Sequence, residues 1–150
     1  MLLQPDDIRK YIHYFPSNVS ESIFFSSKYD YKTLAHPVEV KITQAQYDKA
    51  VASWNLYNVL LPKCTELNNA GTEREKAGKI DEAIAFYEQN VGEDKYPATH
   101  AYDRLLVIYR QNKDYVNERR IASLAAKIFG GQPKYAERLA KIEELISKTK

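Results

Sequence analysis

The sequence contains one cysteine, Cys64, in 150 residues. A lone cysteine cannot form an intramolecular disulfide, so nothing in the chain points to an oxidising compartment. A cysteine nucleophile needs an activating base nearby, and no histidine lies close to Cys64 in the sequence. We therefore expect Cys64 to be a small core residue and the protein to be cytoplasmic.

Long apolar runs are also missing. No stretch approaches the roughly 18 consecutive apolar residues that a membrane-spanning helix needs, so we expect no membrane partner. The segment from Met1 to Asp7 shows neither a basic leader nor an apolar core, and we expect no secretory signal there. With only 5 Gly and 6 Pro, the chain also lacks the composition of a disordered protein.

Charge of one sign is not in excess. The chain has 22 Lys and Arg residues and 20 Asp and Glu residues, which gives a formal net charge of +2 and a pI near 8.5. Dedicated nucleic-acid-binding domains are more basic than this. The overall charge therefore does not call for a polyanionic partner.

The residue patterns of common enzymes and metal sites are absent as well. His13, His36 and His100 stand far apart and show no spacing for shared metal ligation. The chain has no Gly-rich phosphate loop, no Gly-x-Ser-x-Gly sequence and no cysteine pair. We therefore expect no catalytic activity, no metal and no cofactor.

What the chain does contain is apolar residues at helical spacing. They recur at three- and four-residue steps in stretches that end at turn residues. These stretches cover residues 43–61, 63–77, 81–91, 98–112, 115–129 and 133–148. The sequence therefore predicts an all-α fold. The last stretch is expected to be a capping helix, because its outer side is charged.

Residues at the ends of these stretches give local signals. Thr43 and Gln46 fit a capping box, and Gly78 suits the left-handed turn after a helix. Asp81 can cap the helix that follows. Pro62 either ends the first stretch or lies in the first turn of the next helix, where its missing N–H donor costs nothing.

Residues 1–42 are expected to form an irregular arm ahead of a helical domain over residues 43–150. Asp6 or Asp7 could cap a short helix here, residues 22–25 lean toward β structure, and residues 38–42 alternate like a half-buried strand. Two structures fit these signals: a small β element, or an extended arm packed on the helices. The aromatic arm could also pair with a second copy of the chain, so a homo-oligomer stays open.

Two parts of the helical region share a pattern. The first part carries Leu67-Asn68-Asn69-Ala70-Gly71, then Gly78-Lys79-Ile80-Asp81-Glu82-Ala83-Ile84 and Tyr87, and it resembles a tetratricopeptide repeat (TPR). The second part is looser. It matches at Tyr102, Leu105, Tyr109, Asp114-Tyr115 and Ala125. In this part Leu106 replaces the small residue, Lys113 the turn glycine and Glu118 the alanine. The resemblance covers about residues 64–131, as two degenerate repeats. Residues 43–61 could be a decayed third repeat or a single packing helix.

The resemblance implies a short α-α superhelix of antiparallel helix pairs that binds a peptide or partner protein. Binding would use the concave face, which the first helix of each pair lines. On this chain the implied contact residues are Asn68, Thr72, Lys76, His100, Asp103 and Arg110. The alternative is that these residues form an ordinary solvated helix face. The function that the resemblance implies is a non-catalytic interaction module or scaffold.

A second hypothesis concerns the basic residues of the C-terminal helices, which could contact nucleic acid. They are Arg119, Arg120, Lys127, Lys134, Arg138, Lys141, Lys148 and Lys150. Nucleic-acid binding needs a sustained positive face. Glutamates interrupt this one, and a mixed solvated surface with helical ion pairs is the simpler interpretation. The partner and its pathway are not specified by the sequence.

Overall fold

The computed structural model describes residues 1–27 and 30–148 of the chain. The protein is all-α apart from two very short strands. It divides into two compact units, Met1–Val59 (unit 1) and Leu60–Lys150 (unit 2). The division therefore falls after residue 59, whereas the sequence placed it after residue 42. The reason is that the helix starting at Gln44 packs Ala50 and Tyr47 into the core of unit 1.

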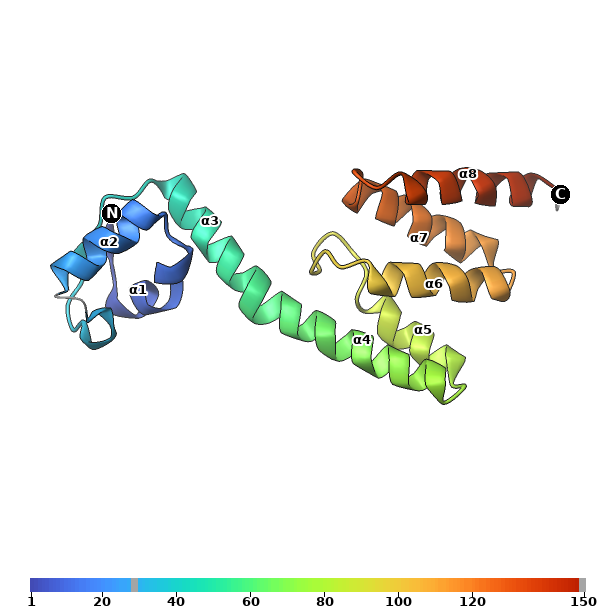
Figure 1. Ribbon diagram of the computed structural model, residues 1–150, viewed down its shortest axis with the longest axis horizontal. Helices are drawn as coiled ribbons and strands as arrows, with labels where there is room; N and C mark the ends of the chain where they lie inside the picture. Colours follow the sequence, from blue (N-terminus) through green and yellow to red (C-terminus); the bar gives the residue numbers. More distant parts are fainter. Residues whose placement is uncertain (28–29, 149–150) are drawn as a thin grey trace. The chain divides into compact units, whose positions relative to one another are not determined.

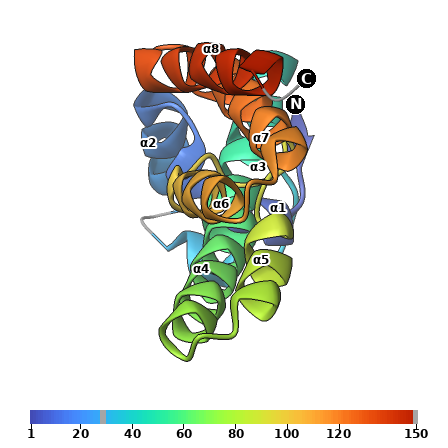
Figure 2. The same ribbon diagram turned by 90° about the vertical axis from the view of Figure 1, so that its right-hand side faces the viewer.

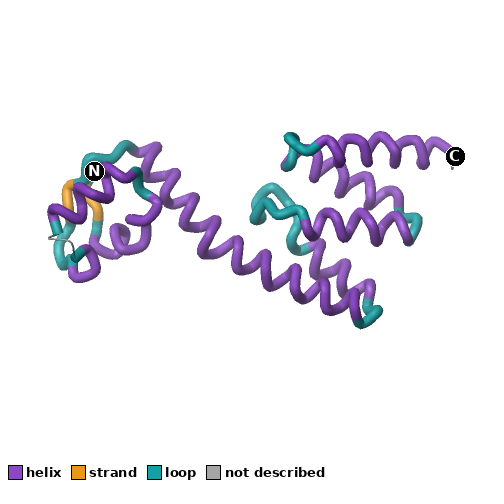
Figure 3. The backbone as a smooth tube through the Cα atoms, viewed as in Figure 1, coloured by secondary structure: helices purple, strands orange, loops and turns teal. Residues whose placement is uncertain are grey.

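Unit 1 is built from short elements. In chain order they are β1 (Leu2–Leu3), α1 (Pro5–Tyr11), the 3-10 helix η1 (Ile12–Tyr14), α2 (Ser17–Ser26), the 3-10 helix η2 (Tyr31–Thr33), β2 (Val38–Glu39) and α3 (Gln44–Asn55). The two strands pair antiparallel, with Leu2 opposite Glu39 and Leu3 opposite Val38. Figure 3 shows this pair as the orange segments. Of the two alternatives for residues 1–42, the small β element is the one found.

The first 42 residues are more ordered than an irregular arm, because they carry a core of their own. Its buried members are Leu3, Ile8, Ile12, Phe15, Val19, Ile23, Val40 and Ala50. Residues 22–25 are helical rather than extended. Val19 and Ile23 stand one helical turn apart on α2, and both are buried. That burial outweighs the β preference of the aromatic run.

Two capping predictions for unit 1 have opposite outcomes. Thr43 Oγ1 accepts a hydrogen bond from the Gln46 amide at 3.1 Å, and Gln46 Oε1 accepts one from the Thr43 amide at 3.0 Å, which confirms the capping box. The proposed capping of α1 by Asp6 or Asp7 is wrong. Pro5 opens that helix, so both aspartates lie in its first turn, where a carboxylate favours the helix dipole.

Unit 2 holds five helices among its described residues. They are α4 (Leu61–Lys76), α5 (Ile80–Glu88), α6 (His100–Gln111), α7 (Tyr115–Ile128) and α8 (Pro133–Lys148). Each helix packs against the next one in the chain, and Figure 1 shows them stacked in that order. A π-helical turn, η3 (Leu56–Leu60), precedes α4, and Pro62 lies in the first turn of α4. Leu60 is itself helical (φ −73°, ψ −43°), so Pro62, which has no N–H to donate, follows closely on the π-helical turn.

The turns inside the two helix pairs use the same backbone conformation. Gly78 has φ +74° between α4 and α5, as predicted, and Lys113 has φ 56° between α6 and α7. The α7 helix is capped by Asp114, whose Oδ1 accepts from the Asn117 amide at 3.2 Å. The predicted cap by Asp81 is wrong, because α5 begins at Ile80 and places Asp81 in its first turn.

The core of unit 2 runs through α5, α6, α7 and α8. Tyr87, Tyr102 and Tyr135 are among its largest fully buried side chains. Phe129 joins two of them, with its ring centroid 5.2 Å from that of Tyr102 and 5.7 Å from that of Tyr135. Tyr87, Tyr102, Tyr109 and Tyr135 therefore supply apolar rings to the core, each with a hydroxyl that can form hydrogen bonds. None of the described helices has both the length and the apolar character needed to cross a membrane.

Candidate functional site

The six sequence-predicted contact residues lie on α4 and α6, the helices that open the two antiparallel pairs. Figure 2 shows α4 and α6 on one side of unit 2 and α5 and α7 on the other. Side chains of α8 reach α6, as described below. We call the surface around these residues the α4–α6–α8 face. Its members are Thr72, Glu75, Lys76, His100, Asp103, Arg104, Arg110, Lys134 and Arg138.

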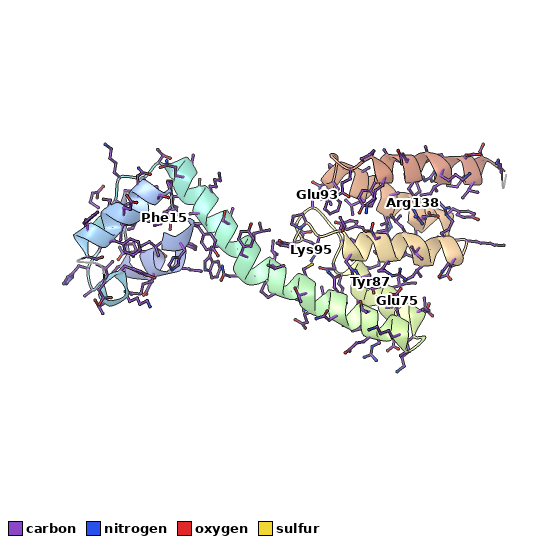
Figure 4. The ribbon with its side chains drawn as sticks, in the orientation of Figure 1. Phe15, Glu75, Tyr87, Glu93, Lys95 and Arg138 are labelled. Carbon is purple, nitrogen blue, oxygen red and sulfur yellow. The ribbon has the colours of Figure 1, made fainter. Side chains whose placement is uncertain are left out.

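Between α4 and α6, the face is a hydrogen-bonded network. Thr72 Oγ1 lies 3.3 Å from Tyr87 Oη and 3.2 Å from His100 Nε2. The Glu75 carboxylate accepts a hydrogen bond from the Tyr87 hydroxyl at 3.0 Å. It also accepts hydrogen bonds from the Arg104 guanidinium at 2.9 and 3.1 Å. Figure 4 labels Tyr87 and Glu75 close together in this region. The network fixes the polar side chains at this edge of the face.

The pKa values of two members reflect these contacts. Burial raises the pKa of Tyr87 above its ordinary value, with a further contribution from its hydrogen bond to Glu75. The hydrogen bond to Glu75 raises the pKa of Arg104. At neutral pH the Tyr87 phenol therefore stays protonated and donates a hydrogen bond, while the Arg104 guanidinium stays charged. Neither group is prepared for proton transfer.

Asn68 does not lie free on the face, because it belongs to an interior amide cluster. Asn90 is buried and donates from Nδ2 to Asn68 Oδ1 at 2.7 Å and to the Cys64 carbonyl at 3.0 Å. Cys64 is buried, as the sequence predicted. A small pocket of about 280 Å³ borders this cluster and is lined by Cys64, Asn90 and Tyr96, among others.

Asp103 connects α6 to α8. Its Oδ1 accepts a hydrogen bond from the Tyr135 hydroxyl at 2.8 Å, and its Oδ2 accepts one from Lys134 Nζ at 3.2 Å. Burial, and then the hydrogen bond to Asp103, raise the pKa of Tyr135 well above its ordinary value. Asp103 therefore holds the capping helix in place, and its charge is balanced by Lys134.

Glu118 of α7 is the main feature that the sequence did not reveal. Its side chain is fully buried, and it accepts from Arg110 Nε at 2.7 and 2.9 Å and from Arg138 Nε at 3.1 Å. Arg138 also donates to the Leu106 carbonyl at 2.9 Å. The sequence identified Glu118 only as the replacement of an expected alanine. A usable signal was that a carboxylate at a core position requires a cation.

The predicted contact residues thus fall into two groups. Asn68, Thr72, Asp103 and Arg110 make hydrogen bonds inside the unit. His100 is exposed while it contacts Thr72, and Lys76 is exposed with no hydrogen bond or ion pair to any described residue. Among the six, the structure brings Thr72 and His100 into contact, and it joins Asn68 to Asn90 and Cys64.

The basic residues of the C-terminal helices are largely paired with carboxylates. The pairs are Arg119–Glu143 at 3.6 Å, Arg120–Glu88 at 2.5 Å, Lys127–Glu93 at 2.6 Å, and both Lys141 (3.6 Å) and Lys148 (3.0 Å) with Glu144. Lys150 lies outside the described residues. Such pairing interrupts the positive surface that phosphate contacts require.

In the part of the chain that the structure describes, no three or more His, Cys, Asp or Glu side chains come together in a group that could hold a metal ion. Comparison of the chain with protein-family models, curated proteins and solved structures found no match.

Proposed function

We propose that this protein is a non-catalytic, TPR-like interaction module that holds a peptide or a segment of a partner protein on the α4–α6–α8 face. The observation that carries the proposal is the fixed set of half-exposed polar side chains on this face. Hydrogen bonds between α4, α6 and α8 restrict their rotamers before any partner arrives. A surface ordered in advance loses less side-chain entropy on binding.

The helix pairs support the TPR-like part of the proposal. Gly71 allows α4 to approach α5 closely at Tyr87, as the resemblance implies for a small residue at this position. The two pairs also turn at Gly78 and Lys113, at matching places in the pattern and with similar φ angles. These features favour two copies of one helix-pair design, the second altered in its packing residues.

Selection and mapping of peptide ligands test the proposal. Random peptides displayed on phage are selected on the 150-residue chain, and the binding surface is then mapped from chemical-shift changes in the same 17.3 kDa protein. We expect the largest changes at exposed positions of the face such as Lys76 and His100. Changes confined to α5 and α7, or no selected peptide at all, would contradict the proposal.

A pair of matched variants adds a quantitative check. Lys76→Glu with His100→Glu places negative charge at two exposed positions of the face. It should weaken peptide binding at least tenfold, because like-charge contacts at an interface cost several kcal/mol and about 1.4 kcal/mol is already a factor of ten. Lys127→Glu with Val116→Glu alters two exposed positions of α7. This control should change affinity by less than about twofold.

A further inference from the structure

The cluster around Glu118 contains more positive charge than the glutamate requires. Arg110 and Arg138 both place Nε within 3.1 Å of the same carboxylate oxygen, Glu118 Oε2. One buried carboxylate therefore balances one of the two guanidinium groups. The second positive charge is uncompensated at this point of the surface.

The hydrogen-bonding capacity of the two arginines is also only partly used. Arg110 donates to Glu118 through Nε alone, so its Nη1 and Nη2 have no acceptor among the described residues. Arg138 uses Nε and Nη2, which leaves its Nη1 without an acceptor in the described chain. Their side chains are 32% and 29% exposed, so a ligand can reach them.

We propose that Arg110 and Arg138 form an oxyanion subsite on the α4–α6–α8 face and that it takes the carboxylate of an Asp or Glu side chain in the partner peptide. This proposal rests on the proposed function and adds the chemistry of the ligand. Figure 4 shows Arg138 on α8, and its bond to the Leu106 carbonyl directs it toward α6, which carries Arg110.

Glu118 acts as the positioning residue of this subsite. It is fully buried and accepts three hydrogen bonds from the two Nε atoms, so it holds both guanidinium planes from below. Arginine recognises carboxylates through parallel N–H donors, and a fixed guanidinium loses less entropy when it does so. The free terminal nitrogens are the donors that a ligand oxygen would use.

The charge balance favours a carboxylate over a phosphate. The local excess is one positive charge, which one carboxylate neutralises. A phosphorylated side chain carries close to two negative charges at neutral pH and would leave the second one unpaired.

The test uses the peptides selected on the 150-residue chain. We expect the selected peptides to share an Asp or Glu at one position. Replacing that residue with Asn or Gln should weaken binding about tenfold, as does the loss of a hydrogen bond to a charged group. The protein variant Arg110→Gln should cause a similar loss for the original peptide and little further loss for the neutral peptide.

Two variants keep the test independent of folding. Arg110→Gln leaves Glu118 paired with Arg138, so the buried charge stays compensated, and the melting curve of the variant confirms that it folds. Arg110→Lys keeps the charge but removes the planar fork, and we expect it to restore only part of the affinity. Lys127→Gln on α7 is the matched control for loss of a positive charge. In this variant, removing the peptide carboxylate should weaken binding as much as it does in the unchanged protein.

The outcomes separate this proposal from the one on which it rests. Peptides that bind the α4–α6–α8 face with no acidic preference, or whose carboxylate shows no coupling with Arg110, would overturn the subsite and leave the interaction module intact. Failure of any peptide to bind the face would overturn both. A phosphoserine peptide that binds more than about tenfold tighter than its glutamate counterpart would assign the subsite to phosphate instead.

Discussion

Gly71 of α4 lies against the ring of Tyr87 in α5 so closely that a Cβ at residue 71 would stand 2.8 Å from Cδ1 and from Cζ of that ring, and closer still to Cε1. Tyr87 is fully buried, and its hydroxyl contacts Thr72 and Glu75. The ring therefore cannot rotate away without losing these contacts. The absence of a side chain at residue 71 sets the spacing of the two helices.

The first prediction concerns this contact. Gly71→Ala should destabilise the protein by about 1–3 kcal/mol, because the added methyl overpacks a core with no room for it. The helix propensity of alanine offsets up to about 1 kcal/mol of that cost. Urea unfolding measures the net effect. Gly131→Ala is the control, since nothing lies within 4 Å of a Cβ there, and it should change stability by less than about 0.5 kcal/mol.

The second prediction concerns the two turns. Gly78→Ala should lower the free energy of unfolding by about 1 kcal/mol, because alanine disfavours a φ of +74° and no packing contact is involved. Lys113→Gly should raise it by a similar amount, since lysine already occupies the left-handed region there. Thermal melting should show opposite shifts of about 2–4 °C. Shifts of the same sign would contradict this account.

The third prediction concerns the buried glutamate. Glu118→Gln should destabilise the protein by about 3 kcal/mol or more, because it leaves two guanidinium groups without a counter-charge. Glu143→Gln removes a carboxylate that is 53% exposed and pairs with Arg119, so it should cost less than about 1 kcal/mol. Denaturant midpoints compare the two. Equal effects would mean that Arg110 and Arg138 find other partners.

The fourth prediction concerns alkaline pH. Burial, and then the hydrogen bond to Glu88, raise the pKa of Tyr109 well above its ordinary value. The unfolded chain loses this proton near pH 10, whereas the folded chain keeps it, so the stabilisation is complete below about pH 10 and declines as the pH rises further. In Tyr109→Phe, stability should fall less steeply, by about 1.4 kcal/mol per pH unit. Urea midpoints at pH 9, 10 and 11 measure both slopes.

Local signals predicted the helical part of the fold well. The last helix spans Pro133–Lys148 as the periodicity indicated, and the roles of Thr43 and Gly78 follow from their own side chains and neighbours. The first 42 residues were harder, because their core joins residues far apart in the chain. Ile8 and Val40 share that core, and no short-range pattern connects them.

The candidate site was predictable as a surface but not as a set of free side chains. Helical spacing predicted the helices that carry Thr72, Asp103 and Arg110. Asp103 and Arg110 form hydrogen bonds with Tyr135 and Glu118, which come from helices whose packing the sequence does not specify. Glu118 was missed for the same reason: a glutamate in an amphipathic helix is usually exposed, and only the tertiary structure shows this one to be buried.

Ala83 and Glu118 stand at matching places in the two helix pairs, so the pairs are not interchangeable. A copy of α4–α5 in place of α6–α7 would set an alanine where Arg138 of α8 requires a carboxylate. The last helix of the unit is therefore matched to one particular pair, and exchanging that pair would require a second change on α8.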